Sequence, residues 1–157
     1  TQILPLDSGA PSVWLDGHRR EDVVVNVSPT RAFAAATVAH GRVGIDVCDH
    51  ADGHRLERIA GRVLSDGEAE ACGAFATAEN GAAVWALKEA GLKLFIGGVF
   101  DPGARAIFVE SLQPPRVRAP VRIRAALLQL PGAALAIARD APQVPTSPSL
   151  FLPEVPT

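Results

Sequence analysis

A single long helical pattern lies between two regions that resemble strands, and this arrangement limits the fold more than any other feature of the sequence. The pattern runs from Glu79 to Phe95, and Gly97 and Gly98 are expected to end it. Its apolar residues recur at helical spacing and would form one side of the helix: Val84, Leu87, Gly91, Leu92 and Phe95. We therefore expect one long helix that packs on strands contributed by both ends of the chain.

The first of these regions contains β-branched or small apolar runs separated by turn residues. The runs are Asp22 to Ser28, Ala32 to Ala39 and Arg42 to Val47. Pro29 and His40-Gly41 separate them, so the pattern predicts a short antiparallel meander. Before it, the segment Thr1 to Arg20 is expected to be mostly extended, with a short strand over Ser12 to Leu15.

Two short helices are predicted between the meander and the long helix. From His54 to Val63 the apolar residues share one helical face. Ser65 and Glu68 then form an S-x-x-E capping box, which is typical of a helix start.

The last third of the chain returns to strand patterns. A strand is predicted over Ala106 to Leu112, and Val117 to Leu130 and Ala133 to Ala138 form a hairpin around Pro131-Gly132. Residues 141–157 are rich in proline and are expected to lie outside the domain formed by residues 1–140. The fold class is therefore predicted as α+β, with an antiparallel sheet packed on one long helix.

Composition excludes several classes of protein. The chain has 157 residues, 48% of them hydrophobic and 20% charged, which suits one folded domain. No apolar run reaches the roughly 18 residues that span a bilayer. A formal net charge of −2 argues against a nucleic-acid-binding protein. With two cysteines and no signal-peptide pattern we expect a cytoplasmic protein, and the absence of methionine suggests that the native start lies upstream of Thr1.

Two segments carry residues suited to chemistry. In Val43-Gly44-Ile45-Asp46-Val47 an apolar strand is expected to end in a carboxylate. In the long helix, Trp85, Glu89 and Lys93 fall four residues apart on one face, with Lys88 on its flank. Taken singly, Asp46 is typical of a turn residue, and Glu89 with Lys93 is typical of a surface ion pair.

Together, in this order, the two segments resemble the signature of the 4'-phosphopantetheinyl transferase superfamily. VGIDV matches its G-[IV]-D strand, and WALKEAGLK matches its W-[SA]-x-K-E-[AS]-x-x-K helix. Gly9-Ala10-Pro11 is similar to the family's G-K-P, and Asn26 to Thr30 is similar to its N-[IV]-S-H-S. These upstream elements resemble the surfactin-type branch, here shortened at the N-terminus, because the short holo-acyl-carrier-protein-synthase branch begins at the G-I-D strand.

The resemblance implies transfer of the phosphopantetheine arm of coenzyme A to a serine of an acyl or peptidyl carrier protein. Asp46 and Glu89 would bind Mg2+, which prefers oxygen ligands. Glu89 would take the proton of the serine hydroxyl, directly or through water. Lys88 and Lys93 would add positive charge around the phosphates, with Lys93 stabilising the leaving 3',5'-ADP, and Ser28 would contact the nucleotide.

Three positions depart from the family pattern. Cys48 stands where surfactin-type members have an acid, Pro29 replaces a histidine and Ala10 replaces a lysine. A thiol is a poor Mg2+ ligand. These departures support an alternative, a catalytically degenerate relative that acts as an interaction or scaffold domain. Because most of one half of a surfactin-type enzyme is absent, an apolar face should be exposed, so we expect a homo-oligomer or part of a larger assembly.

Two further groups of residues permit other interpretations. Cys48, Asp49, His50, Asp52 and His54 combine metal-ligand types, although their spacing matches no zinc motif and is typical of a polar loop. Arginines with the same strand parity form a second group: Arg116, Arg118, Arg122 and Arg124. They fit either a solvated sheet face or a docking surface for an acidic carrier protein or the 3'-phosphate of coenzyme A.

Overall fold

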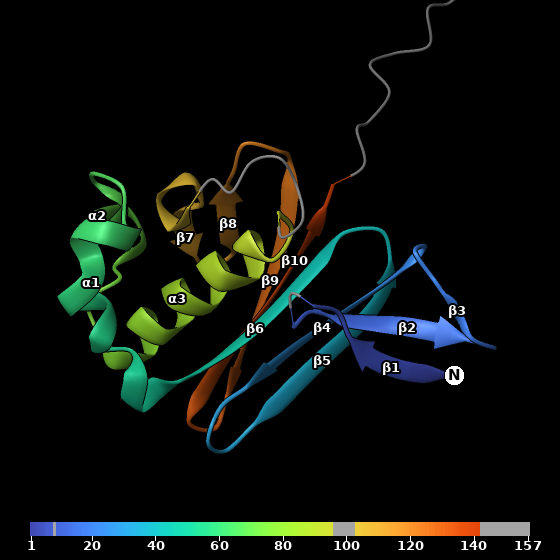
Figure 1. Ribbon diagram of the computed structural model, residues 1–157. Coiled ribbons are helices and arrows are strands. Elements are labelled where there is room, and N and C mark those ends of the chain that lie inside the picture. The colour runs from blue at the N-terminus through green and yellow to red at the C-terminus, as the bar shows by residue number, and fades with distance from the viewer. Residues whose placement is uncertain (8, 96–102, 142–157) are drawn as a thin grey trace, which may run out of the picture.

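Strands occupy both ends of the chain and the helices lie between them (Figure 1). The computed structural model describes residues 1–7, 9–95 and 103–141. The strands are β1 (Gln2–Pro5), β2 (Pro11–Leu15), β3 (His18–Arg19), β4 (Val23–Pro29), β5 (Ala34–His40), β6 (Val43–Asp49), β7 (Phe108–Leu112), β8 (Pro115–Arg118), β9 (Ile123–Leu130) and β10 (Ala133–Asp140). The helices are α1 (Arg55–Val63), α2 (Glu68–Cys72) and α3 (Ala78–Leu92), with short 3-10 turns η1 (His50–Asp52) and η2 (Ala104–Ala106).

The central unit is helix α3 packed on the antiparallel sheet β6–β10–β9, which confirms the predicted α+β class. The N-cap Thr77 starts α3, because its hydroxyl accepts the N–H of Asn80 at 3.1 Å. The helix ends at Leu92, earlier than the predicted Phe95, and Gly97 and Gly98 lie outside the described residues.

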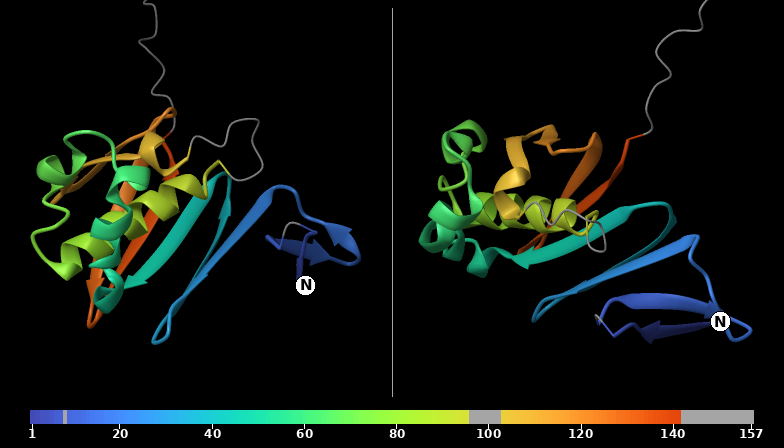
Figure 2. Two further views of the ribbon diagram at one scale, coloured as in Figure 1. Left: turned by 60° about the vertical axis from the view of Figure 1, so that its left-hand side comes forward. Right: turned by 45° about the horizontal axis from the view of Figure 1, so that its top comes forward.

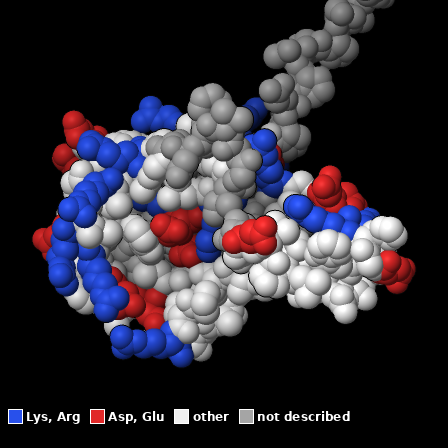
Figure 3. All heavy atoms as spheres, viewed as in Figure 1, with Lys and Arg blue, Asp and Glu red and all other residues white. Residues whose placement is uncertain are grey.

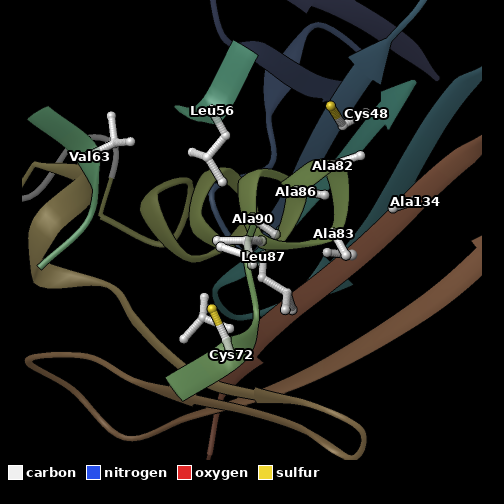
Figure 4. Packing of buried hydrophobic residues seen from close by; sticks show 14 of the residues in the cluster. Cys48, Leu56, Val63, Cys72, Ala82, Ala83, Ala86, Leu87, Ala90 and Ala134 are labelled. Carbon is white, nitrogen blue, oxygen red and sulfur yellow. The ribbon is translucent and has the colours of Figure 1, made fainter. Parts of the chain in front are cut away.

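The prediction that α3 has one apolar side is wrong, because the helix is buried on nearly every side. Small residues make this dense packing feasible, since Ala82, Ala83, Ala86 and Ala90 are all fully buried. Figure 4 shows Leu56 of α1 and Cys72 of α2 pointing toward α3, and Val63 of α1 belongs to the same buried cluster. The consequence is that a charged residue of α3 can lie in the core.

Gly44 lets strand β6 lie directly against α3. A Cβ atom added at Gly44 would collide with the carbonyl oxygen of Ala90 in α3. Residues alternate between the two faces of a strand, so Gly44, Asp46 and Cys48 all face the helix. The glycine of the VGIDV segment therefore brings Asp46 beside the end of α3.

The predicted meander is only partly correct. β4 and β5 form an antiparallel hairpin, but β6 pairs with β10 and not with β5. β4 instead contacts β6 through side chains. For example, the side-chain amide of Asn26 donates a hydrogen bond to the carbonyl oxygen of Val43 at 2.6 Å. Figure 2 shows the helices on one side of β6 and the N-terminal strands on the other.

The N-terminal and C-terminal predictions are confirmed in outline. The strand expected at Ser12 to Leu15 is β2, which forms a small sheet with β1 and β3. β9 and β10 form the expected hairpin, and Gly132 at its turn has a φ of 86°. The long strand expected from Val117 is divided, because β8 pairs with β7 and not with β10.

The described part of the chain contains no helix long and apolar enough to cross a membrane. β10 ends at Asp140, and residues 142–157 lie outside the described residues, so the domain limit at residue 140 stays a prediction.

Candidate functional site

A cavity of about 590 Å³ opens between β6 and the helices. Four parts of the chain line it: residues 28–31 of β4 and its turn, residues 46–49 and 52 of β6 and η1, residues 55, 56 and 59 of α1, and residues 85 and 89 of α3. The cavity thus collects residues from both sequence segments in which chemistry was predicted.

Asp46 lies in the middle of β6 and is 7% exposed. The expectation that it ends the strand is wrong, because β6 continues through Cys48 to Asp49 and Asp46 pairs with Ala136 of β10. Its Oδ1 accepts hydrogen bonds from the Ser28 hydroxyl at 2.7 Å and from the Lys93 ammonium at 2.9 Å. A buried carboxylate needs such donors, and here they also fix its orientation.

Lys93 follows the last turn of α3 and reaches back to β6. Its Nζ donates to the carbonyl oxygen of Ile45 at 2.7 Å as well as to Asp46. These contacts hold the ammonium in place beside the cavity. The prediction that Asp46 and Lys93 meet in one site is therefore supported by their geometry, whereas their roles stay predictions.

Glu89 is half-buried and lines the same cavity. Burial, together with the negative charge of Asp46, raises the pKa of Glu89, and Lys93 partly opposes this shift. Two carboxylates therefore lie close enough to repel each other, with one ammonium near them. Such a pair suits a proton acceptor or a ligand for a cation.

Ser28 lines the cavity but its hydroxyl is already engaged. It donates to Asp46 and accepts the N–H of Val47 at 3.1 Å, and the side chain is buried. In this arrangement Ser28 holds Asp46, and its predicted contact with a nucleotide would require the hydroxyl to exchange one of these partners.

The predicted role of Lys88 is wrong. The side chain is fully buried, and its ammonium lies 2.7 Å from the Oε1 of Glu68. It also donates to the carbonyl oxygens of Ala104, at 3.0 Å, and Ile107. Burial lowers the pKa of Lys88, an effect that the hydrogen bond and charge of Glu68 oppose. Lys88 therefore cannot supply positive charge to the cavity, because every donor is turned into the core.

Glu68 was expected only as a capping residue and is also the partner of Lys88. Its Oε2 accepts the N–H of Ser65 at 2.9 Å, as a capping box would require, but Ser65 is not the N-cap of α2, because this helix begins at Glu68 after the N-cap Gly67. Its Oε1 accepts the N–H of Val109 at 2.8 Å. The carboxylate thus ties α2 to α3 and to the strand β7, a role that the S-x-x-E pattern alone does not reveal.

The segment from Cys48 to His54, which includes the end of β6 and the turn η1, does not gather metal ligands. Within the described residues, no group of three or more His, Cys, Asp or Glu side chains is placed to hold a metal ion. Burial, with added repulsion from Asp46, raises the pKa of the Cys48 thiol to about 12. The thiol is therefore protonated at neutral pH and is a poor ligand in this state.

The four arginines of the C-terminal region do not reach the cavity. All are exposed, and none is among the described residues that line it. Arg118 stacks over Phe108 and lies 3.7 Å from Glu110, so it is partly neutralised. A basic surface that the sequence analysis missed lies instead on α1, where Arg55, Arg58 and Arg62 are spaced on one helical face.

Comparison with known proteins places the chain in a family. The family model of the 4'-phosphopantetheinyl transferase superfamily matches residues 42–137, which include both the VGIDV and the WALKEAGLK segments. The chain belongs to this superfamily. No curated protein sequence gives a match.

Solved structures of holo-acyl-carrier-protein synthases share the fold. One from Bacillus anthracis str. Ames, in complex with CoA (3',5'-ADP), is 18% identical with a TM-score of 0.53, covering 64% of this chain and 96% of that one. One from Helicobacter pylori, in complex with coenzyme A, is 21% identical with a TM-score of 0.51, covering 63% of this chain and 99% of that one. The more specific assignment to the surfactin-type branch stays a prediction.

The superfamily match begins after the β4–β5 hairpin. Residues 28–31, which form one wall of the cavity, therefore lie outside the matched region. The candidate site of this chain combines a superfamily portion, which carries Asp46 and Glu89, with a wall contributed by the N-terminal strands.

Proposed function

We propose that the chain is a Mg2+-dependent 4'-phosphopantetheinyl transferase that moves the phosphopantetheine arm of coenzyme A to a serine of an acyl or peptidyl carrier protein. One observation carries the proposal: Asp46 and Glu89 line a single cavity, and Lys93 is bonded to Asp46. These residues come from the two segments that resemble the superfamily signature.

The cavity suits a small-molecule substrate. Its volume of about 590 Å³ lies within the range of about 300–1,000 Å³ that is usual for ligand pockets. Two solved structures with this fold hold coenzyme A or its 3',5'-ADP portion, which supports coenzyme A as the substrate here.

The donor set fits a hard cation. Asp46 and Glu89 offer carboxylate oxygens, which Mg2+ prefers, and Mg2+ keeps several waters, so two protein ligands suffice. Repulsion by Asp46 contributes to the raised pKa of Glu89, and a cation between the two would relieve it. When bound, Mg2+ would neutralise negative charge on the pyrophosphate.

Glu89 is the proposed proton acceptor. The serine oxygen of the carrier attacks the phosphorus that bears the pantetheine arm, the bond from that phosphorus to the bridging oxygen breaks, and 3',5'-ADP leaves with the bond electrons. The hydroxyl proton passes to Glu89. Burial, the larger cause of the raised pKa of Glu89, makes it a stronger base than an exposed carboxylate.

Lys93 is proposed to stabilise the charge that develops on the leaving group. Its ammonium is already held by Ile45 and Asp46, so little reorganisation is needed when substrate binds. Asp46 fixes this ammonium, and Ser28 in turn fixes Asp46.

The basic face of α1 is the proposed docking surface for an acidic carrier protein. Figure 3 shows Lys and Arg side chains gathered along the left edge of the molecule, over α1. Arg55 of this helix also lines the cavity, so a partner bound there would lie beside the reacting groups. This location is favoured over the four C-terminal arginines, which are not among the lining residues.

Mass spectrometry of a carrier protein tests the proposal directly. Incubated with coenzyme A and Mg2+, the carrier should gain the mass of the phosphopantetheine arm. Glu89→Gln should slow this gain by about a hundredfold or more, the usual contribution of a general base. The matched control is Glu79→Gln, because Glu79 is an exposed glutamate in the first turn of the same helix.

A catalytically silent scaffold is the second candidate function. The observation in its favour is the buried, protonated thiol of Cys48, which stands where a third carboxylate would be expected. In that case the carrier would bind without gaining mass, and Glu89→Gln would leave binding unchanged. Transfer by the parent protein would exclude this candidate.

A further inference from the structure

The cations at the cavity differ in whether they are already paired. The carboxylates that line it are Asp46, Asp49, Asp52 and Glu89. Lys93 is bonded to Asp46, and Nη1 of Arg55 lies 3.2 Å from Asp52. Arg31 also lines the cavity, but within the described residues it forms no ion pair or hydrogen bond through its side chain. A cationic group without a partner is available to an anionic ligand.

The turn that carries Arg31 is held in place by its neighbours. The N–H of Thr30 donates to the carbonyl of Phe33 at 2.7 Å, and the Thr30 hydroxyl accepts the N–H groups of Ala32 at 3.2 Å and Phe33 at 3.0 Å. Phe33 packs against the buried cluster that contains Ile45. The backbone at Arg31 is therefore fixed relative to β6, although the side chain itself is exposed.

The rest of this wall offers little to an anion. The Ser28 hydroxyl is bonded to Asp46 and Val47, and Pro29 has neither a side-chain donor nor a backbone N–H. The Thr30 hydroxyl is already hydrogen-bonded within the turn. Arg31 is thus the first residue after β4 whose side chain can donate to a ligand in the cavity.

We propose that Arg31 binds a phosphate group of coenzyme A. The inference rests on the proposed function and adds a substrate-binding residue from the N-terminal hairpin, outside the region that matches the superfamily. A guanidinium presents a planar fork that donates two parallel hydrogen bonds to a phosphate. Both the 3'-phosphate and the pyrophosphate of coenzyme A offer this chemistry.

Calorimetric titration with coenzyme A measures the contribution of Arg31. We expect Arg31→Gln to raise the Kd about tenfold, as expected for loss of a charged hydrogen bond. Arg31→Lys should recover part of the affinity, since lysine keeps the charge but not the fork. Arg42→Gln is the matched control, because Arg42 is an exposed arginine that precedes β6 and does not line the cavity.

Dephospho-coenzyme A separates the two phosphate sources. If Arg31 binds the 3'-phosphate, the effect of Arg31→Gln disappears with this ligand. If it binds the pyrophosphate, the effect persists. The inference is overturned if Arg31→Gln, folded as shown by an unchanged Tm, binds coenzyme A as tightly as the parent and Arg42→Gln do, and in that case the proposed function stands.

Inorganic pyrophosphate distinguishes failure of the inference from failure of the proposed function. If the parent binds pyrophosphate in an Arg31-dependent manner but does not bind coenzyme A, Arg31 is a phosphate-binding residue and the proposed function is wrong. If the parent binds neither ligand, both are wrong.

Discussion

The ammonium nitrogen of Lys93 lies 2.9 Å from Oδ1 of Asp46 and joins the end of α3 to the middle of β6. The two residues belong to the two sequence segments that resemble the superfamily signature. Their contact is mostly shielded, since the side chains are 16% and 9% exposed, respectively. The pair therefore contributes to both the packing and the proposed chemistry, so a change at Asp46 should affect stability as well as transfer.

Asp46→Asn should reduce transfer by about a hundredfold or more, because it removes one of the two proposed metal ligands and the charge beside Lys93. It should also lower the free energy of unfolding by about 1–3 kcal/mol, since Lys93 loses its charged partner. Mass spectrometry measures the first effect and urea denaturation the second. The control is Asp22→Asn, because Asp22 pairs with Arg20 on the surface, where both are about half exposed. Parental transfer by Asp46→Asn, or transfer that persists in a chelator, would refute the metal role.

Because of Glu89, the transfer rate and the stability of the fold should depend on pH in opposite directions. Burial and Asp46 raise the pKa of Glu89, so the proposed base is deprotonated only at a higher pH than an ordinary glutamate. Since a bound cation would oppose this shift, the transfer rate should rise as Glu89 loses its proton, and this rise should move to lower pH as the Mg2+ concentration increases. Between the pKa of Glu89 in the unfolded chain and its raised pKa in the folded protein, only the folded protein keeps this proton. The free energy of unfolding therefore falls as the pH rises through this range.

The variant Glu89→Gln tests the direction of these two pH dependences. At neutral pH and without Mg2+, the variant should have a higher Tm than the parent, because a neutral amide avoids the cost of a buried charge near Asp46. With Mg2+ present, the variant should have the lower activity. At acidic pH, where Glu89 is protonated, the two proteins should have similar stability. Glu79→Gln should change neither property appreciably, since Glu79 is 65% exposed. A parent that is more stable than Glu89→Gln at neutral pH would contradict the argument.

The sequence predicted the groups at the site better than it predicted their surroundings. Asp46, Glu89 and Lys93 could be found because local motifs place them on a strand and a helix. The role of Lys88 could not be predicted, because its partner Glu68 lies 20 residues away in the sequence. The residues around Glu68 indicate only a capping residue. The sequence of an alanine-rich helix also does not indicate how many of its sides are buried by other elements. A lysine on the flank of such a helix is therefore predicted to be exposed.

Strand order was harder to predict for a related reason. β6 follows β5 after a short turn, which favours a hairpin, yet it pairs with β10 from the far end of the chain. The close contact between Gly44 and Ala90 keeps β6 against α3, where β10 also packs. Arg31 was missed because the sequence around it is typical of a turn, and only the structure shows that this turn lines the cavity.

Glu68 and Lys88 should behave as an energetically coupled pair. Breaking a buried ion pair leaves an uncompensated charge, so Glu68→Gln or Lys88→Met alone should destabilise the fold by about 3–5 kcal/mol. The double variant should lose less than the sum of the two single losses. Urea denaturation measures all three proteins. Additive losses would show that the two side chains, 2.7 Å apart in the structure, are not coupled.

The outer face of the β4–β5 hairpin should mediate self-association, as expected for a homo-oligomer. Val27 and Val38 lie on this face and are 47% and 64% exposed. Exposed apolar groups of this kind favour burial against a partner. Sedimentation at micromolar concentration should show a dimer or larger species, which Val38→Lys should convert to monomer. Val121→Lys, at an exposed valine outside this hairpin, is the control, and a monomeric parent would refute the prediction.

Cys48 decides between an active enzyme and a scaffold. It faces α3 from the same side of β6 as Asp46 and lines the cavity. Cys48→Glu would therefore add a carboxylate beside the proposed metal ligands. In an active enzyme, the Mg2+ concentration for half-maximal transfer should fall, because a further anionic oxygen strengthens binding of a hard cation. Cys48→Ser should stay close to the parent.

The stability of Cys48→Glu supplies the second measurement. Cys48 is 9% exposed, so the new carboxylate is costly unless a cation compensates it. In an active enzyme, the lowered Tm of Cys48→Glu should recover when Mg2+ is added, since binding to the folded state stabilises it. In a scaffold, repulsion among Asp46, Glu89 and the new side chain would persist and Mg2+ would have no effect. A destabilised variant that does not respond to Mg2+ would therefore favour the scaffold over the enzyme.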